Sequence, residues 1–361
     1  MQLRIPGPTP CPPEALEASG RQMINHRGKE FFALIERVTD GLKAVYQTKN
    51  DVFILTASGT GGLEAAVVNT LSPGDKVLSA TCGVFGDRFA DIAQTYGADV
   101  QRLTFEWGQP IDPTALEKAL KDDASIKTVF LTHNETSTGV TNDLKELSRI
   151  VKQYDKLLLV DAISSMAVVN LPTDEWGCDV VVSGSQKAYM VPPGLSMVSV
   201  SEHAWKAREQ ARMPNFYWDF KRAKQSLEKW QNPWTPAVSV IFALDATLKL
   251  MLEEGLPAIF ERHAKVGQAA REGVKALGLE LFARESHASN SVTAVKPGDA
   301  YDAATIVKMM REDHGIVLAG GQRALQGKIF RIGHLGYVSV AEIAEVMTAL
   351  ADVLPRARQG G

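Results

Sequence analysis

Short apolar runs alternate with helix-like segments between about residue 50 and residue 200, and this alternation limits the possible folds more than any other feature. The seven runs lie at 52–56, 76–79, 100–104, 128–132, 157–161, 180–183 and 195–200. Helical patterns at 85–96, 113–120 and 143–154 lie between some of them, and Asn142 is the predicted N-cap of the last helix. The alternation predicts an α/β fold with a mostly parallel seven-stranded sheet flanked by helices. Ligands of such sheets bind at the carboxyl ends of the strands.

The length of 361 residues is about twice that of a typical single domain, which predicts two domains. A helical pattern that starts near Thr235 ends at Gly255, and Leu256-Pro257 begins another helix. The prolines up to Pro13 exclude a helix interior and predict an extended segment. We therefore expect an N-terminal arm at 1–16, a large domain at 17–255 and a smaller α+β domain at 256–361.

Composition favours a small-molecule partner. A formal charge of −3 with 22% charged residues gives no reason to expect nucleic acid or an acidic membrane. The chain has no apolar run of spanning length and no signal-peptide core at its start, so we expect a cytoplasmic protein. Its three cysteines, Cys11, Cys82 and Cys178, are widely spaced, which favours reduced structural thiols over disulfides or a metal site.

Two of the apolar runs lead to an acid and an amine. The run at 157–161 ends in Asp161, and the run at 180–183 leads through a small polar loop to Lys187. Alone, such an Asp is more often a helix cap or turn residue, and most lysines are solvated surface residues. Together, a carboxylate for a protonated pyridine nitrogen and an amine for a Schiff base suggest pyridoxal phosphate.

A small-residue segment, Thr56-Ala-Ser-Gly-Thr-Gly-Gly62, follows a predicted strand and opens a helix. Free backbone amides at a helix N-terminus, with the hydroxyls of Ser58 and Thr60, form a site for a phosphate. Gly59 would let the backbone approach the anion closely. A structural glycine turn is the simpler alternative, and the spacing does not match the dinucleotide pattern G-x-G-x-x-G.

Three further segments place polar or aromatic side chains near the predicted strand ends. His133 to Gly139 follows one strand, and within it Thr136 is a candidate donor to a ring hydroxyl, whereas His133 is better explained as a structural histidine. Phe85 follows another strand and is a candidate stacking platform, although a phenylalanine alone is more often core. Arg331, among small and apolar residues of the second domain, suits a substrate carboxylate.

Taken together, these motifs resemble the class V, fold type I aminotransferases that depend on pyridoxal phosphate, closest to the alanine:glyoxylate and serine:pyruvate branch. The resemblance covers almost the whole chain. Its markers are Pro6-Gly-Pro8, Ser58 to Gly61, Phe85, His133 to Gly139, Asp161, Ser185-Gln-Lys187, Thr235-Pro236 and Arg331-Ile-Gly333.

The resemblance implies a role for each matching residue. Lys187 forms the Schiff base, Asp161 pairs with the pyridine nitrogen, and Ile163 packs on the ring face opposite Phe85. The phosphate is held by Ser58, Gly59, Thr60 and Gln186, with Thr235 from a partner subunit, since the family builds its sites at a homodimer interface. Thr136 contacts the ring hydroxyl, Arg331 binds the substrate α-carboxylate, and Gly7 of the arm also lies in the substrate site.

Two positions depart from the mammalian form of the branch. Phe85 stands in the place of a stacking tryptophan, which keeps the platform but reduces its area. Asn232 stands where a tyrosine reaches the phosphate across the dimer. Its amide is shorter, so the sequence leaves undecided whether Asn232 contacts the phosphate.

The resemblance implies ping-pong transamination between alanine or serine and glyoxylate or pyruvate. Alternatives on the same scaffold are an aspartate or 2-aminoethylphosphonate aminotransferase, a decarboxylase and a kynureninase-like enzyme. A cysteine desulfurase is disfavoured because no cysteine follows Cys178. From other classes, a nicotinamide-dependent dehydrogenase and a non-catalytic cofactor-binding assembly subunit stay open. The sequence leaves the amino donor undecided, and Arg27 and Arg323 are candidates either for a second acidic group or for interface charges.

Overall fold

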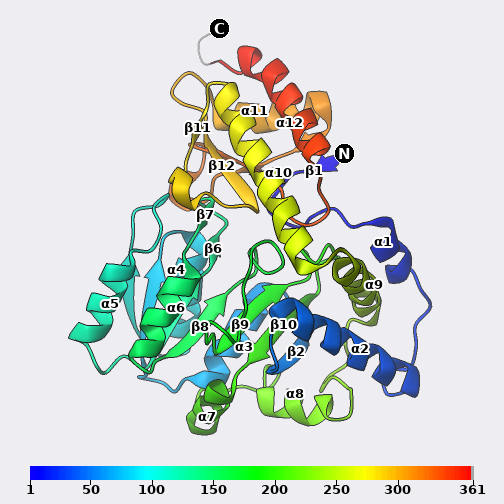
Figure 1. Cartoon of the computed structure of the whole chain (residues 1–361), viewed down its shortest axis with the longest axis vertical. Coiled ribbons are helices and arrows are strands. Elements are labelled where there is room, and N and C mark those ends of the chain that lie inside the picture. Colours follow the sequence, from blue (N-terminus) through cyan, green and yellow to red (C-terminus); the bar gives the residue numbers. More distant parts are fainter. Residues whose placement is uncertain (359–361) are drawn as a thin grey trace.

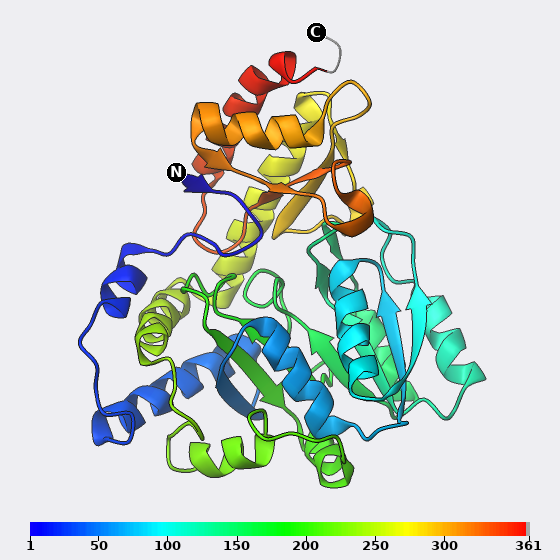
Figure 2. The same ribbon diagram turned by 180° about the vertical axis from the view of Figure 1, so that it is seen from behind.

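The structure is a computed structural model that describes residues 1–358. A large lobe surrounds a central sheet, and a smaller lobe with its own sheet lies above it (Figures 1 and 2). The N-terminal end lies beside the smaller lobe, and the chain then passes down to the large lobe at α1 (Pro13–Ser19) (Figure 1).

Within residues 1–358, the central sheet has seven strands in the order β2-β10-β9-β8-β5-β3-β4. They are β2 (Asp51–Thr56), β3 (Lys76–Thr81), β4 (Asp99–Thr104), β5 (Thr128–Thr132), β8 (Leu157–Asp161), β9 (Val180–Gly184) and β10 (Leu195–Val200). Strand β10 runs antiparallel to β2 and β9, and the other pairs are parallel. The predicted α/β fold and its mostly parallel sheet are therefore confirmed.

Alternate residues of these strands face two separate helical layers, because successive side chains of a strand point to opposite faces. Val52 and Ile54 belong to one core cluster, whereas Phe53 and Leu55 belong to the other. The first cluster includes residues of α2 (Lys29–Tyr46), α5 (Pro113–Asp122), α6 (Leu144–Gln153) and α9 (Val238–Glu254). The second includes residues of α3 (Gly59–Thr70), α4 (Val84–Thr95), α7 (Glu202–Gln210) and α8 (Phe220–Leu227). Burial on both faces explains why the strands are almost continuously apolar.

The helices predicted between the strands form within one or two residues of their expected ends, and α9 begins three residues after Thr235. The N-cap of α6 differs from the prediction. Asp143 caps this helix, because its side chain accepts a hydrogen bond from the Glu146 N–H at 3.1 Å. Asn142 is buried and its amide donates to Thr132 O at 2.7 Å. The prediction of Asn142 as the cap was wrong because the tertiary contact with β5 uses its side chain.

The smaller lobe combines an antiparallel sheet with helices. The sheet order is β11-β12-β15-β14, from β11 (Glu280–Leu281), β12 (Val292–Lys296), β14 (Ala319–Gly320) and β15 (Phe330–Gly333). Its helices are α10 (Leu256–Ala276), α11 (Ala303–His314) and α12 (Val340–Val353), with short 3-10 turns η1 (Glu285–His287), η2 (Arg323–Leu325) and η3 (Leu354–Arg356). Their apolar faces form a separate core. We keep the division of the chain at residue 255, between α9 and α10, as a proposal.

Two short ribbons complete the fold. β1 (Gln2–Leu3) pairs in parallel with β13 (Ile316–Val317), which attaches the start of the arm to the smaller lobe. β6 (Asn134–Glu135) pairs with β7 (Val140–Thr141) beyond the carboxyl end of β5. Among the helices of residues 1–358, none has an apolar stretch long enough to cross a membrane.

Candidate active site

Asp161 and Lys187 lie on neighbouring strands of the sheet. Asp161 is the last residue of β8 and is in register with Val182 of β9. Lys187 follows the end of β9 by three residues. The structure therefore brings the predicted acid and amine to the same carboxyl edge of the sheet.

The amine of Lys187 is enclosed by the N-terminal arm. Its Nζ donates a hydrogen bond to the carbonyl oxygen of Pro6. Gly7 has a φ of +134°, which other residues rarely adopt, and a Cβ added there would lie 2.8 Å from this Nζ, so the position favours glycine. Burial, together with the charges of Arg331 and Arg88, lowers the pKa of Lys187 to about 8, although Asp161 opposes the shift. A lowered pKa increases the fraction of neutral amine, which is the nucleophilic form.

The carboxylate of Asp161 is 3% exposed and forms no ion pair with another residue in the part of the chain that the structure describes. Burial raises the pKa of Asp161 to about 7, and a hydrogen bond from the Ile163 N–H to Oδ1, at 2.9 Å, partly offsets this effect. A buried carboxylate without a cation is unfavourable unless a protonated partner binds it. A pyridinium N–H is such a partner.

The N-terminus of α3 forms the third part of the site. Ser58 precedes the helix, and its hydroxyl makes no capping hydrogen bond. A Cβ on Gly59 would lie 2.4 Å from Cδ1 of Ile163, so the first turn of α3 packs directly against that side chain. Gln186 lies beside it, and its buried Oε1 has no hydrogen-bond partner in residues 1–358. The unbonded amides of a helix start, together with free hydroxyl and amide groups, fit a phosphate.

The side chain of Arg331 is hydrogen-bonded to the backbone of Thr136. The Thr136 hydroxyl donates to Ser164 Oγ at 2.7 Å, and its carbonyl oxygen accepts from Arg331 Nη1 at 3.1 Å. Arg331 also donates to Gly320 O, from Nε at 3.1 Å and Nη2 at 2.9 Å. It is 5% exposed, and burial lowers its pKa to about 10. These contacts hold the guanidinium of the smaller lobe at the edge of the large lobe's site.

Phe85 is the second residue of α4 and is held by groups from another segment. Its N–H donates to Glu135 Oε2 at 3.0 Å, and so does the N–H of Gly86. The Arg88 guanidinium lies over the Phe85 ring, 4.8 Å from its centroid. We propose that the ring stacks on the cofactor.

The remaining predicted residues lie at the rim of the large lobe. Thr235 is exposed and Asn232 is buried, and both line a small cavity that also includes Thr56 of β2. Asn232 Nδ2 donates to Ile54 O at 2.8 Å. Contacts of Thr235 and Asn232 with a phosphate across a dimer stay predictions.

The two undecided arginines have partners within the chain. Arg27 donates from Nη1 to Gln231 Oε1 at 2.8 Å and to Asn232 O at 2.7 Å. Arg323 lies 3.8 Å from Asp87 and 3.5 Å from Asp91, which links η2 to α4. These contacts favour structural charges over substrate ligands at both positions.

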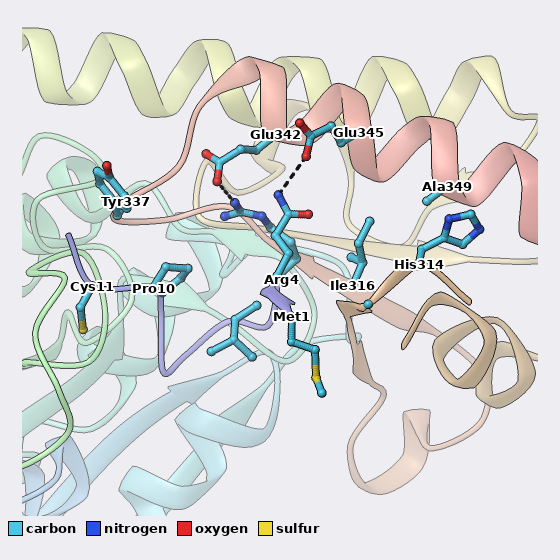
Figure 3. Close-up of a pocket in the computed structure, with 13 residues that line it drawn as sticks. Met1, Arg4, Pro10, Cys11, His314, Ile316, Tyr337, Glu342, Glu345 and Ala349 are labelled. Atoms are coloured by element: carbon cyan, nitrogen blue, oxygen red, sulfur yellow. Dashed lines mark hydrogen bonds and ion pairs between the residues drawn. The ribbon is translucent and has the colours of Figure 1, made fainter. Parts of the chain in front are cut away.

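A second cavity, of about 830 Å³, lies between the arm and α12 (Figure 3). Figure 3 shows Arg4 paired with Glu342 on one side of it, and Gln2 Nε2 donates to Glu345 at 3.3 Å. The N–H of Gly333, two residues after Arg331 in β15, donates to Arg4 O. The cavity does not include Lys187 or Asp161, but its ion pair anchors the arm that encloses Lys187.

The residues present fit pyridoxal phosphate. The unpaired carboxylate of Asp161, the amine of Lys187, and the orphaned Gln186 amide beside the α3 N-terminus match the pyridine nitrogen, the aldehyde and the phosphate in turn. No group of three or more His, Cys, Asp or Glu side chains suited to a metal ion occurs within the described range.

Sequence reasoning overlooked three residues of this site: Glu135, Ser164 and Arg88. Glu135 lies within the quoted run from His133 to Gly139, but nothing local shows that its carboxylate reaches α4. Gly83 directly before the helix was no signal either, because glycine is itself a common N-cap residue.

The chain belongs to the class V aminotransferases, whose family model matches residues 14–344. It is therefore a pyridoxal-phosphate-dependent enzyme of the fold type I architecture, as the sequence predicted.

Named relatives cover nearly the whole chain. The chain is 46% identical to the soluble hydrogenase small subunit of Synechococcus sp. (strain PCC 6716), over 98% of this chain and 92% of the relative. It is 38% identical to the L-aspartate–glyoxylate aminotransferase of Paracoccus denitrificans, over 97% and 91%. Among solved structures, the alanine–glyoxylate aminotransferase of Nostoc sp. superimposes with a TM-score of 0.94 at 30% identity, covering 98% of this chain and 94% of the other.

Proposed function

We propose that this protein transfers the amino group of alanine or serine to a small 2-oxo acid, glyoxylate or pyruvate, in a ping-pong cycle. The observation that carries this proposal is the juxtaposition of the Lys187 amine, the unpaired Asp161 carboxylate and the Arg331 guanidinium at one edge of the sheet. The names of relatives support glyoxylate as the acceptor, since an L-aspartate–glyoxylate aminotransferase and an alanine–glyoxylate aminotransferase are both similar to this chain.

Each residue has a task in this cycle. Bound pyridoxal phosphate supplies an electron sink for the carbanion that forms when the substrate loses its α-proton. Lys187 Nζ would hold the cofactor through its aldehyde carbon and, as a free amine, would move the substrate's α-proton as base and acid. Asp161 would pair with the ring nitrogen and keep it protonated. Arg331 orients the substrate through its α-carboxylate.

Three parts of this proposal concern the assembly. We propose a homodimer in which Thr235 of each subunit completes the partner's phosphate site. Gly7 of the arm would border the substrate, because it lies against Lys187 Nζ. We place the enzyme in the cytoplasm.

A panel of half-reactions tests the donor. The purified holoenzyme is mixed with single amino acids, and the change in visible absorbance is followed by stopped flow. We expect alanine and serine to react at least about tenfold faster than aspartate or 2-aminoethylphosphonate. A faster reaction with aspartate would replace the proposed donor and keep the enzyme class.

Replacement of the amine tests the chemistry. In Lys187→Ala we expect turnover to fall by roughly a thousandfold or more, because both the nucleophile and the proton carrier are lost. Borohydride reduction of the wild-type protein, followed by peptide mapping, should place the cofactor on the Lys187 peptide. Lys224→Ala, which removes a surface amine paired with Asp51, is the matched control. Substantial turnover of Lys187→Ala would overturn the assignment.

A second candidate is an assembly subunit that binds the cofactor without catalysis. Similarity to a relative named as a hydrogenase subunit favours it. A coloured protein that responds to no amino donor in the panel would support this role over transamination.

A further inference from the structure

Helix α4 begins without a capping residue of its own. Gly83 occupies the N-cap position and makes no side-chain hydrogen bond. The first N–H groups of a helix have no intrahelical acceptor, and leaving them unpaired in a buried place is costly. The start of α4 carries Phe85, so the groups that satisfy these amides also decide where that ring lies.

A segment about 50 residues further along the chain supplies every acceptor. Glu135 Oε2 accepts from the N–H groups of Phe85 and Gly86, at 3.0 Å each. Ser137 Oγ accepts from the Val84 N–H at 3.0 Å and donates to Glu135 Oε1 at 2.5 Å. The Ser137 N–H donates to the same Oε1 at 3.0 Å. The first three amides of α4 are therefore capped from outside the helix.

Glycine at position 83 is what permits this arrangement. A Cβ there would lie 2.5 Å from Cγ of Glu135 and 2.5 Å from Oγ of Ser137. Glu135 itself is 0% exposed. Such close contact leaves the carboxylate and the helix start little freedom to move relative to each other.

The residue between the two capping groups reaches the opposite side of the site. Thr136 donates to Ser164 Oγ at 2.7 Å and accepts from Arg331 Nη1 at 3.1 Å through its carbonyl. Three successive residues, Glu135, Thr136 and Ser137, thus connect the ring platform, the predicted ring-hydroxyl contact and the substrate-binding arginine.

We propose that Glu135 is a positioning residue for the reaction, one that holds Phe85 in register with Thr136 and Arg331. This inference rests on the proposed function, because it assumes that the cofactor lies between Phe85 and Ile163. Its carboxylate does not touch the reacting atoms. It acts through the backbone of α4.

The test compares Glu135→Ala and Glu135→Gln with the wild type. The amide of Gln keeps one acceptor for the Phe85 and Gly86 amides, but its NH₂ would replace the oxygen that accepts from the Ser137 N–H, so it should rescue only part of the loss. We expect the dissociation constant of the apoprotein for pyridoxal phosphate to rise about tenfold or more in Glu135→Ala and about threefold in Glu135→Gln. The visible circular dichroism of the bound cofactor should weaken in the same order, since it reports how the ring is held.

Kinetics and hydrogen exchange add two further readouts. In Glu135→Gln, kcat should fall about tenfold while KM for the amino donor changes less than about twofold, because Phe85 contacts the ring and not the substrate. In the apoprotein, the amides of residues 84–86 should exchange faster than in the wild type.

Asp302→Ala is the matched control, because Asp302 caps α11 in the smaller lobe by accepting from the Thr305 N–H at 2.7 Å. Asp302→Ala should lower thermal stability. It should leave the dissociation constant for pyridoxal phosphate and the visible circular dichroism unchanged. Equal losses in this control, or unchanged cofactor affinity and dichroism in Glu135→Ala, would overturn the inference. If Glu135→Ala does not fold, unchanged values in Glu135→Gln would overturn it. A wild-type protein that binds the cofactor but reacts with no amino donor would instead refute the proposed function alone.

Discussion

At the residue scale, the two titratable groups at the centre of the site have pKa values shifted toward each other. Burial raises the pKa of Asp161 to about 7 and lowers that of Lys187 to about 8. Both shifts have the same cause, since a low-dielectric surrounding penalises the charged form of an acid and of a base alike. Desolvated groups of opposite type at one site are typical of catalysis.

These shifts predict how the stability of the apoprotein depends on pH. An Asp161 with a folded pKa near 7 and an unfolded pKa of about 3.9 keeps its proton in the folded state between these values. At this group the folded state then binds more protons than the unfolded one, so the contribution of Asp161 to the free energy of unfolding decreases as pH rises through this window. Lys187 has the opposite effect, because its folded pKa lies below its unfolded one, and stability should recover between about pH 8 and 10.5.

Urea unfolding of the apoprotein from pH 4 to 10 measures this profile. Asp161→Asn removes this contribution, so its stability relative to the wild type should increase from pH 4 to 7 and exceed it at pH 8 by on the order of 1–4 kcal/mol. Identical profiles for the two proteins would show that Asp161 is not desolvated as described.

At the scale of elements, strand ends and helix starts meet to form the site. β8 and β9 end at the acid and the amine, α3 begins at the predicted phosphate site, and α4 begins at Phe85. Periodicity alone predicted the strands, because a sheet buried on both faces requires apolar runs of this length. The external cap of α4 could not be predicted, since it pairs backbone amides with a side chain distant in sequence.

The close contact between α3 and Ile163 predicts the effect of one methyl group. In Gly59→Ala, the new Cβ would lie 2.4 Å from Cδ1 of Ile163, so either the helix start or the Ile163 side chain must shift. We expect the affinity for pyridoxal phosphate to fall about tenfold, as overpacking of 1–2 kcal/mol would cause. Fluorescence titration of the apoprotein measures it. Gly20→Ala is the control, because its Cβ would be 3.6 Å from the nearest atom. Equal affinity in the two variants would contradict the contact.

At the scale of the whole molecule, the arm connects the two lobes over the site. Gln2 and Arg4 bond to β13 and α12 of the smaller lobe. Thr9 N–H donates to Gln186 O at 3.1 Å, and the Thr9 hydroxyl donates to Lys187 O at 2.9 Å in the large lobe. The arm between these anchors includes Pro6 and Gly7, which lie against the amine. Attachment to both lobes therefore determines how tightly Lys187 is enclosed.

Removal of the Arg4 side chain should loosen this connection. Arg4 is 2% exposed and pairs with Glu342 (Figure 3), so Arg4→Ala leaves a partly buried carboxylate unpaired. We expect a loss of about 1–3 kcal/mol in the free energy of unfolding and faster proteolysis within residues 4–12. Arg37→Ala, which removes an exposed ion pair with Asp245, should cost less than about 0.5 kcal/mol. If Arg4→Ala lowers the free energy of unfolding no more than this control does, the ion pair does not hold the arm.

The sequence by itself determined the fold class and the cofactor chemistry of this protein. Strand periodicity is local. Asp161 ends β8 and Lys187 follows the end of β9 by three residues, so their meeting at one edge follows from the parallel order of these strands. Only the tertiary structure decided how these groups are held: Glu135 at the start of α4, Pro6 over the amine, and Arg331 on the Thr136 carbonyl. Those contacts join residues that are distant in the chain, and their geometry depends on how the lobes and loops pack, which no local pattern records.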